Sequence, residues 1–167
     1  AENSQSALID LINLATATAV SAPTFTVDQG YAGNGTSSYV NLGSANAGTQ
    51  NSACFGFYNR SNTGVIADVE MGASRAGAGQ DFNCNVSVNY DGNLYFALND
   101  ENGDVGRAAP ANVAGIYVNS RVAAGTATIY KDGSSFATNG QTSSGVPTTN
   151  YCIGAAFEDV KGVSGGF

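Results

Sequence analysis

The chain has no histidine and no tryptophan, and only three of its 167 residues are cysteine. The three, Cys54, Cys84 and Cys152, are widely spaced, and none has a Cys-x-x-Cys partner. A zinc site and a cysteine–histidine catalytic pair are therefore excluded within this chain. The odd count leaves at least one cysteine unpaired, and a single disulfide stays open without an assignment. Because each cysteine lies in a predicted strand, we expect small buried apolar side chains at all three.

Charge is also scarce. Charged residues make up 11% of the chain, and the balance of acidic over basic residues gives a formal net charge of -7. The six basic residues stand singly, whereas binding to a nucleic-acid backbone depends on clustered Lys and Arg. No apolar run reaches the length of a membrane span, and the start, AENSQSALIDLINLATATAV, lacks the basic region of a signal peptide. We therefore expect a soluble domain with no nucleic-acid partner and no membrane insertion.

Glycine, small neutral residues and aromatics make up much of the rest. The chain contains 22 Gly, eight Phe and eight Tyr, and 43% of its residues are hydrophobic. A disordered chain has high charge and few large apolar residues, so this composition predicts a folded protein. The length suits one domain with a real core.

Alternation of apolar and polar residues is clearest at residues 82–90. One predicted face carries Phe82, Cys84, Val86, Val88 and Tyr90 toward a core, and the opposite face, rich in Asn and Ser, is expected to meet solvent. An Asp-Gly pair at residues 91–92 follows as a tight turn into a strand at residues 94–98.

A second hairpin is predicted around Asp132-Gly133, which supplies two positive-φ positions between residues 126–131 and a strand that ends at Gly140. Further strands are predicted at residues 39–42, 52–59, 65–71, 114–122 and 151–155. Residues 6–15 are the exception, because Leu8, Leu11 and Ile12 would share a helix face, and a short helix and a strand are both open there. Roughly ten short strands predict a two-sheet sandwich or a barrel, and we favour the sandwich because its strands share one core.

Three segments resemble a known family: PTFTVDQGYAGNGTSSYVNLG, NSACFGFYNRSN and GIYVNSRVAAGTATIYKDGSSFATNGQTSSGVPTTNYCIGA. They are similar to the concanavalin A-like (LamG-like) jelly-roll domains of tailed-bacteriophage structural proteins, in order over residues 23–156. The resemblance implies an all-β, two-sheet antiparallel jelly-roll sandwich. It also implies a domain at residues 23–167 behind an N-terminal segment at residues 1–22. Such domains continue past a glycine-rich loop into a closing strand. The sequence stops at Gly165-Gly166-Phe167, which leaves three alternatives open: the strand is absent, lies outside this sequence or is supplied by a partner.

The same resemblance implies a virion protein, and we expect it to act without catalysis. The expected protein sits on the exterior of a virion, as a capsid decoration or as part of a tail fibre or spike. Its expected partners are other virion proteins or copies of itself, together with host or environmental glycans. No cofactor is expected.

Glycan binding uses an aromatic face against a sugar ring, with amide, carboxylate or guanidinium groups bonding the hydroxyls. Two sets of residues fit that chemistry. One lies at the end of a predicted strand and comprises Tyr58, Asn59, Arg60 and Asn62. The other shares one face of a predicted strand and comprises Tyr117, Asn119 and Arg121. Either set is also explained by ordinary packing, since a strand tyrosine is usually half-buried.

Two further sets of acidic residues provide alternatives. Asp68 and Glu70 are two apart on a predicted strand and would face the same way, which suits a glycoside hydrolase or depolymerase of the same fold. The sequence lacks the longer acidic pattern of the hydrolases that it resembles, so a solvated strand face is the simpler interpretation. Asp100, Asn102 and Asp104 offer oxygen ligands of the kind that calcium prefers, with an ordinary polar turn as the alternative.

Overall fold

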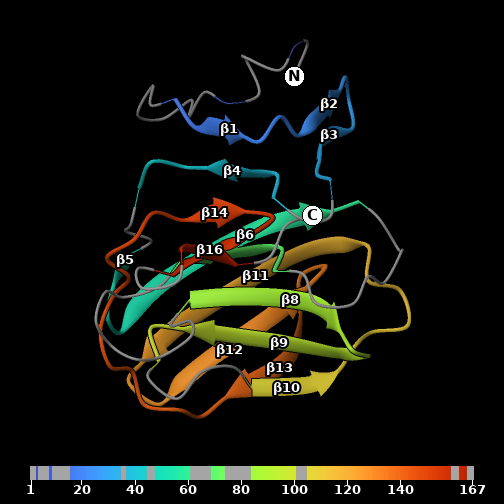
Figure 1. The fold of residues 1–167 in the computed structure, drawn as a ribbon. Helices are drawn as coiled ribbons and strands as arrows, with labels where there is room; N and C mark the ends of the chain where they lie inside the picture. Colours follow the sequence, from blue (N-terminus) through green and yellow to red (C-terminus); the bar gives the residue numbers. More distant parts are fainter. Residues whose placement is uncertain are drawn as a thin grey trace.

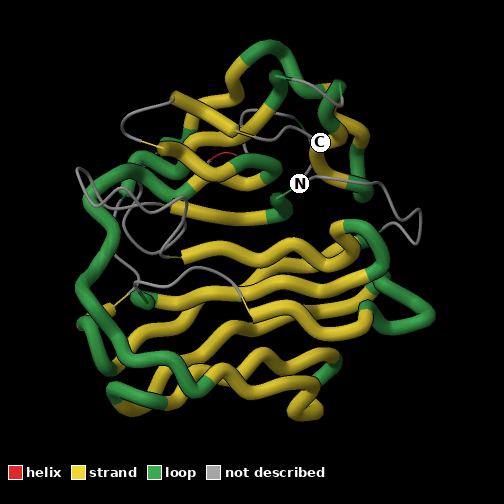
Figure 2. Tube along the Cα trace, turned by 60° about the horizontal axis from the view of Figure 1, so that its bottom comes forward, coloured by secondary structure: helices red, strands yellow, loops and turns green. Residues whose placement is uncertain are grey.

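The computed structural model describes Asn3, Leu8 and residues 16–34, 37–44, 48–60, 69–73, 84–100, 105–158 and 162–164. These residues form an all-β protein with antiparallel sheets and no α-helix (Figure 1). Within the same residues, no helix is long and apolar enough to cross a membrane. Figure 2 shows the chain from another direction, with most of its described length in strands joined by loops at their ends.

Two sheets make up the body of the protein. The seven-stranded sheet has the order β1 (Thr18–Val20), β4 (Tyr39–Asn41), β14 (Cys152–Ile153), β7 (Met71–Ala73), β8 (Cys84–Tyr90), β9 (Asn93–Leu98) and β10 (Val105–Ala108). The five-stranded sheet has the order β13 (Ser134–Asn139), β12 (Thr126–Lys131), β11 (Gly115–Ala123), β6 (Ser52–Asn59) and β5 (Gly48–Thr49). Two separate hairpins complete the fold: β2 (Thr24–Thr26) with β3 (Gly30–Ala32), and β15 (Ala156–Glu158) with β16 (Gly162–Ser164).

Both predicted Asp-Gly hairpins are confirmed. Asp91 and Gly92 have φ of 50° and 79°, and Asp132 and Gly133 have φ of 51° and 80°. Two consecutive positive φ values give the turn whose twist matches that of the strands it joins. The local sequence therefore decides where β8 turns into β9 and where β12 turns into β13.

The two sheets pack face to face around one apolar core, so the predicted sandwich is confirmed at this coarse level. In Figure 1, β8 and β9 lie over β11 and β12. Each sheet contributes fully buried apolar side chains, such as Val86 and Phe96 from one sheet and Tyr117 and Ile129 from the other. The boundaries of β6 and β12 agree with the predicted residues 52–59 and 126–131. The strand predicted at residues 65–71 is not confirmed, because Val69 and Glu70 precede β7 and residues 65–68 lie outside the described residues.

Three further expectations need correction or fall outside the described residues. The prediction that the Asn- and Ser-rich face of β8 meets solvent is wrong, because Asn85 and Ser87 are only 1% and 3% exposed. β8 lies in the interior of its sheet, between β7 and β9, and residues on both of its faces are buried. Alternation along one strand cannot reveal that both faces are covered.

All three cysteines are free. Cys84 and Cys152 are buried as predicted, whereas the prediction of a buried Cys54 is wrong, because Cys54 is exposed. The choice between helix and strand at residues 6–15 lies outside the described residues apart from Leu8.

Candidate functional site

The outer face of the five-stranded sheet, on the side away from the other sheet, gathers most of the exposed large apolar side chains. The described residues include seven such side chains, and five of them lie on β6, β11 and β12. The five are Tyr58 (66% exposed), Ile116 (54%), Val118 (36%), Val122 (74%) and Tyr130 (37%). Scattered exposed apolar residues are normal on a protein surface, but a contiguous group marks an interaction site.

Strand register arranges this face in rows. Val118 and Tyr130 are cross-strand partners, and together they form what we call the ridge. The next row, which we call the trough, runs across four strands and consists of small side chains: Cys54, Ser120, Thr128 and Thr138. At the end of the ridge, Gly56 pairs with Val118 and carries no side chain. A Cβ on Gly56 would lie 2.7 Å from the carbonyl oxygen of Tyr117, so β6 and β11 approach closely there.

Charge is nearly absent from this sheet. None of its five strands contains an acidic residue, although the whole chain carries a net charge of -7. Among the described residues, charged groups stand only at the borders of the outer face: Arg107 Nη2 donates to the Thr138 carbonyl at 3.3 Å, and Lys131 Nζ lies 2.6 Å from the carboxylate of Asp132. That carboxylate also accepts a hydrogen bond of 2.9 Å from the Ile116 N–H. The Lys131 and Ile116 bonds hold the pKa of Asp132 below its ordinary value.

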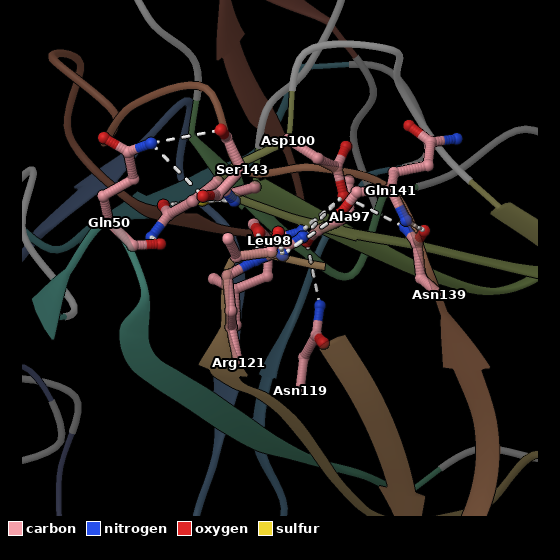
Figure 3. Close-up of polar contacts among 12 residues, drawn as sticks. Gln50, Ala97, Leu98, Asp100, Asn119, Arg121, Asn139, Gln141 and Ser143 are labelled. Carbon is pink, nitrogen blue, oxygen red and sulfur yellow. Dashed lines mark hydrogen bonds and ion pairs between the residues drawn. The ribbon is translucent and has the colours of Figure 1, made fainter. Parts of the chain in front are cut away.

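The inner face of β11 carries polar side chains that join the two sheets (Figure 3). Arg121 is 1% exposed; its Nε donates to the carbonyl of Leu98, and its Nη1 donates to the carbonyl of Ala124 at 2.7 Å. Its Nη2 lies 3.4 Å from the Asp100 carboxylate, which also accepts from Asn139 Nδ2 at 3.0 Å. We call Arg121, Asp100 and Asn139 the polar clamp. Burial lowers the pKa of Arg121, and the neighbouring Asp100 opposes this shift by favouring the charged form.

One of the two predicted glycan-binding sets is therefore misplaced. Tyr117, Asn119 and Arg121 share a strand face as expected, but that face is the inner one, and each residue is at most 1% exposed. The Tyr117 hydroxyl donates to the Val113 carbonyl at 2.9 Å, and Asn119 Nδ2 donates to the Ala97 carbonyl at 2.8 Å. Burial raises the pKa of Tyr117. Their role in this structure is to pack and bond the two sheets.

The other predicted set is partly at the surface. Tyr58 is 66% exposed on the outer face, and Arg60 is also exposed just after the end of β6. The Asn59 side chain turns the other way and donates to the Val113 carbonyl at 3.0 Å. Asn62 lies outside the described residues.

The acidic alternatives are only partly described. Glu70 Oε2 accepts a 2.8 Å hydrogen bond from the Val88 N–H, while Asp68 lies outside the described residues. Asp100 belongs to the polar clamp, and Asn102 and Asp104 lie outside. In the part of the chain that the structure describes, no group of three His, Cys, Asp or Glu side chains could hold a metal ion.

The outer face was not identified from the sequence, although its signal is present in β11. Along this strand Ile116, Val118 and Val122 alternate with Asn119 and Arg121, and the usual inference places the apolar set inside. The structure reverses that inference.

Comparison of the chain with known protein families, with curated proteins and with solved structures found no match.

Proposed function

We propose that this chain is a non-enzymatic structural protein of the exterior of a tailed-phage particle, and that it attaches to another surface through the outer face. One observation carries the attachment role: five of the seven exposed large apolar side chains in the described residues gather on that face. The family resemblance over residues 23–156 supports the location on a virion and a jelly-roll topology. The two antiparallel sheets are compatible with that topology.

The reversed pattern of β11 supports a role beyond folding. The strand buries Asn119 and Arg121 and leaves Ile116, Val118 and Val122 in contact with water. Removing apolar surface from water is worth about 25 cal/mol per Å². The outer face gains this free energy only when another surface covers it, which is the behaviour of an attachment module.

Location on the particle is tested by electron microscopy of intact virions with gold-labelled antibodies against this chain. The proposal expects label on the outside of intact particles. Label that appears only after the particles are disrupted, or no label at all, would contradict it.

A glycan is a second candidate for what the outer face contacts, and the exposed Tyr58 ring favours it. Arg60 follows it at the end of the strand, and Asp132 lies across the sheet beside Ile116, the cross-strand partner of Tyr58. A ring that stacks on a sugar, with a guanidinium and a carboxylate that bond hydroxyls, is the usual chemistry of sugar recognition.

A glycan array tests this second candidate with Tyr58→Ala and a matched variant, Tyr90→Ala. Tyr90 is another exposed strand-end tyrosine, at 45%, on the other sheet. We expect Tyr58→Ala to lose the array signal and Tyr90→Ala to retain it. Equal signals from both variants would remove Tyr58 from the site.

The non-enzymatic role has its own test. We expect no release of reducing sugar from host polysaccharide by the intact protein. Release that Glu70→Gln abolishes would replace this proposal with the hydrolase alternative.

A further inference from the structure

We propose that the outer face pairs with the same face of a second copy of this chain, as a reversible two-fold dimer. This inference rests on the attachment role proposed above and names its partner. It follows from the shape of the face, from its charge and from its size.

The shape of the face is self-complementary. The ridge and the trough are adjacent rows two residues apart, so about 7 Å separates them along the strands. A two-fold axis that runs across the strands between these rows turns one copy over onto the other, with β11 above β11 and β12 above β12. Val118 then faces Ser120 of the second copy, and Tyr130 faces Thr128 of the second copy. Each contact occurs twice, and each ridge enters the opposite trough.

Two stacked sheets lie about 10 Å apart with their strands within about 30° of one another, as in the interior of a sandwich. Large side chains opposite small ones allow that spacing without clashes. Gly56 adds room in the same place, because Cys54 of the second copy faces it across the axis.

The charge distribution allows a second copy to occupy the outer face. Two molecules that each carry a net charge of -7 repel one another. The five-stranded sheet has no acidic residue in its strands, and Arg121, the basic residue on β11, is buried. The outer face is therefore a surface through which two copies can meet without placing carboxylates against carboxylates.

The size of the face sets the expected strength. Four strands about 4.8 Å apart and six residues rising about 3.4 Å each cover roughly 19 by 20 Å. Two copies then cover on the order of 800 Å² in projection, which is below the roughly 1,200 Å² of stable specific interfaces and in the range of weak, transient ones. We therefore expect a dimer that forms and dissociates with concentration.

The test is sedimentation velocity on the intact chain from about 1 µM to about 1 mM, a range that brackets weak association. Wild-type protein should shift from monomer to dimer across this range. Val118→Lys and Tyr130→Lys place a charge on the ridge and should each remain monomeric. Val27→Lys is the matched control, because Val27 is 52% exposed but lies away from the outer face, and it should dimerise like the wild type.

Cys54 provides a readout that needs no variant. It is the exposed cysteine of the three, and the geometry above puts the two Cys54 Cα atoms about 12 Å apart in the dimer. That distance is too long for a disulfide, which needs Cα atoms within about 7 Å, but a short bismaleimide can span it. We expect bismaleimide to cross-link the wild type in proportion to the dimer, and mild oxidation to leave it uncross-linked.

A wild-type chain that stays monomeric throughout overturns the inference. So does a dimer that both ridge variants retain, or one that fails to cross-link through Cys54. Glycan binding by a monomer through Tyr58 would also overturn it while leaving the attachment role in place. Gold label confined to the particle interior would instead remove the proposed function, whatever the oligomeric state.

Discussion

Replacing Arg121 with methionine should strongly destabilise the protein. Methionine retains the length of the side chain but removes the positive charge and all of its donors. The Asp100 carboxylate then stays buried beside Asn139 without its cation, and the carbonyls of Leu98 and Ala124 lose a donor. Removing one partner of a buried ion pair costs about 3 to 5 kcal/mol, because the remaining charge is left uncompensated.

This cost is large relative to the whole stability of a domain, which is about 5 to 15 kcal/mol. For a chain of this length it corresponds to a fall of roughly 6 to 20 °C in the midpoint of thermal unfolding. Urea unfolding of Arg121→Met and wild type, followed by circular dichroism, measures it directly. An unchanged slope with a lower midpoint identifies a change in stability rather than in the compactness of either state.

The matched control is Arg107→Met. Arg107 is an exposed arginine that donates to the carbonyls of Gly106 and Thr138 at 2.8 and 3.3 Å. The Arg107→Met change should lower the free energy of unfolding by no more than about 0.5 kcal/mol, because water replaces the hydrogen bonds of the lost guanidinium. A loss of less than about 1 kcal/mol in the free energy of unfolding of Arg121→Met, or equal losses for the two variants, would refute the claim that the polar clamp stabilises the fold.

Two further predictions concern thiols and acid. Maleimide should modify Cys54 alone in the native protein. Cys84 and Cys152 are buried, and burial raises their pKa values to about 12 and about 11. Mass spectrometry should therefore find one adduct, and a second adduct without denaturant would contradict the burial of these two thiols. Asp132 has a lowered pKa in the folded state because of its bond to Lys131, so its stabilising contribution is present above its ordinary pKa of 3.8 and is lost as the pH falls below it. Asp132→Asn should therefore unfold more readily than wild type at neutral pH, and the difference should shrink as the pH falls below 3.8 and through the lowered pKa of the folded state. A difference that stays constant into acid would contradict this assignment.

Much of the fold could be predicted from local patterns. The Asp-Gly pairs predict both hairpins because a positive φ at two successive residues is a property of those residues and their immediate neighbours. The alternation at residues 52–59 and 126–131 predicts β6 and β12, because each strand has one face in the core and one outside. These inferences need no knowledge of what lies across the sheet.

The candidate site could be predicted only in part. Tyr58 was expected at the surface end of a strand and is there, because β6 ends at Asn59 and its outer residues face solvent. Tyr117 and Asn119 were expected to face a ligand, and they face the other sheet instead. The pattern correctly put Tyr117, Asn119 and Arg121 on the same face, but it could not say which side of the sheet that face would be.

The sequence therefore determines which residues of β11 share a face, since side chains alternate along any strand. Which of the two faces is buried depends on residues that are distant in the chain. Arg121 is inside because the carbonyl of Leu98 accepts from its Nε and the Asp100 carboxylate faces its charge, both at the end of β9. Asn139 of β13 donates to the same Asp100 carboxylate and helps to hold it in place. Once Arg121 is committed to the interior, Ile116 and Val118 must lie outside, and the apolar outer face follows from that tertiary choice.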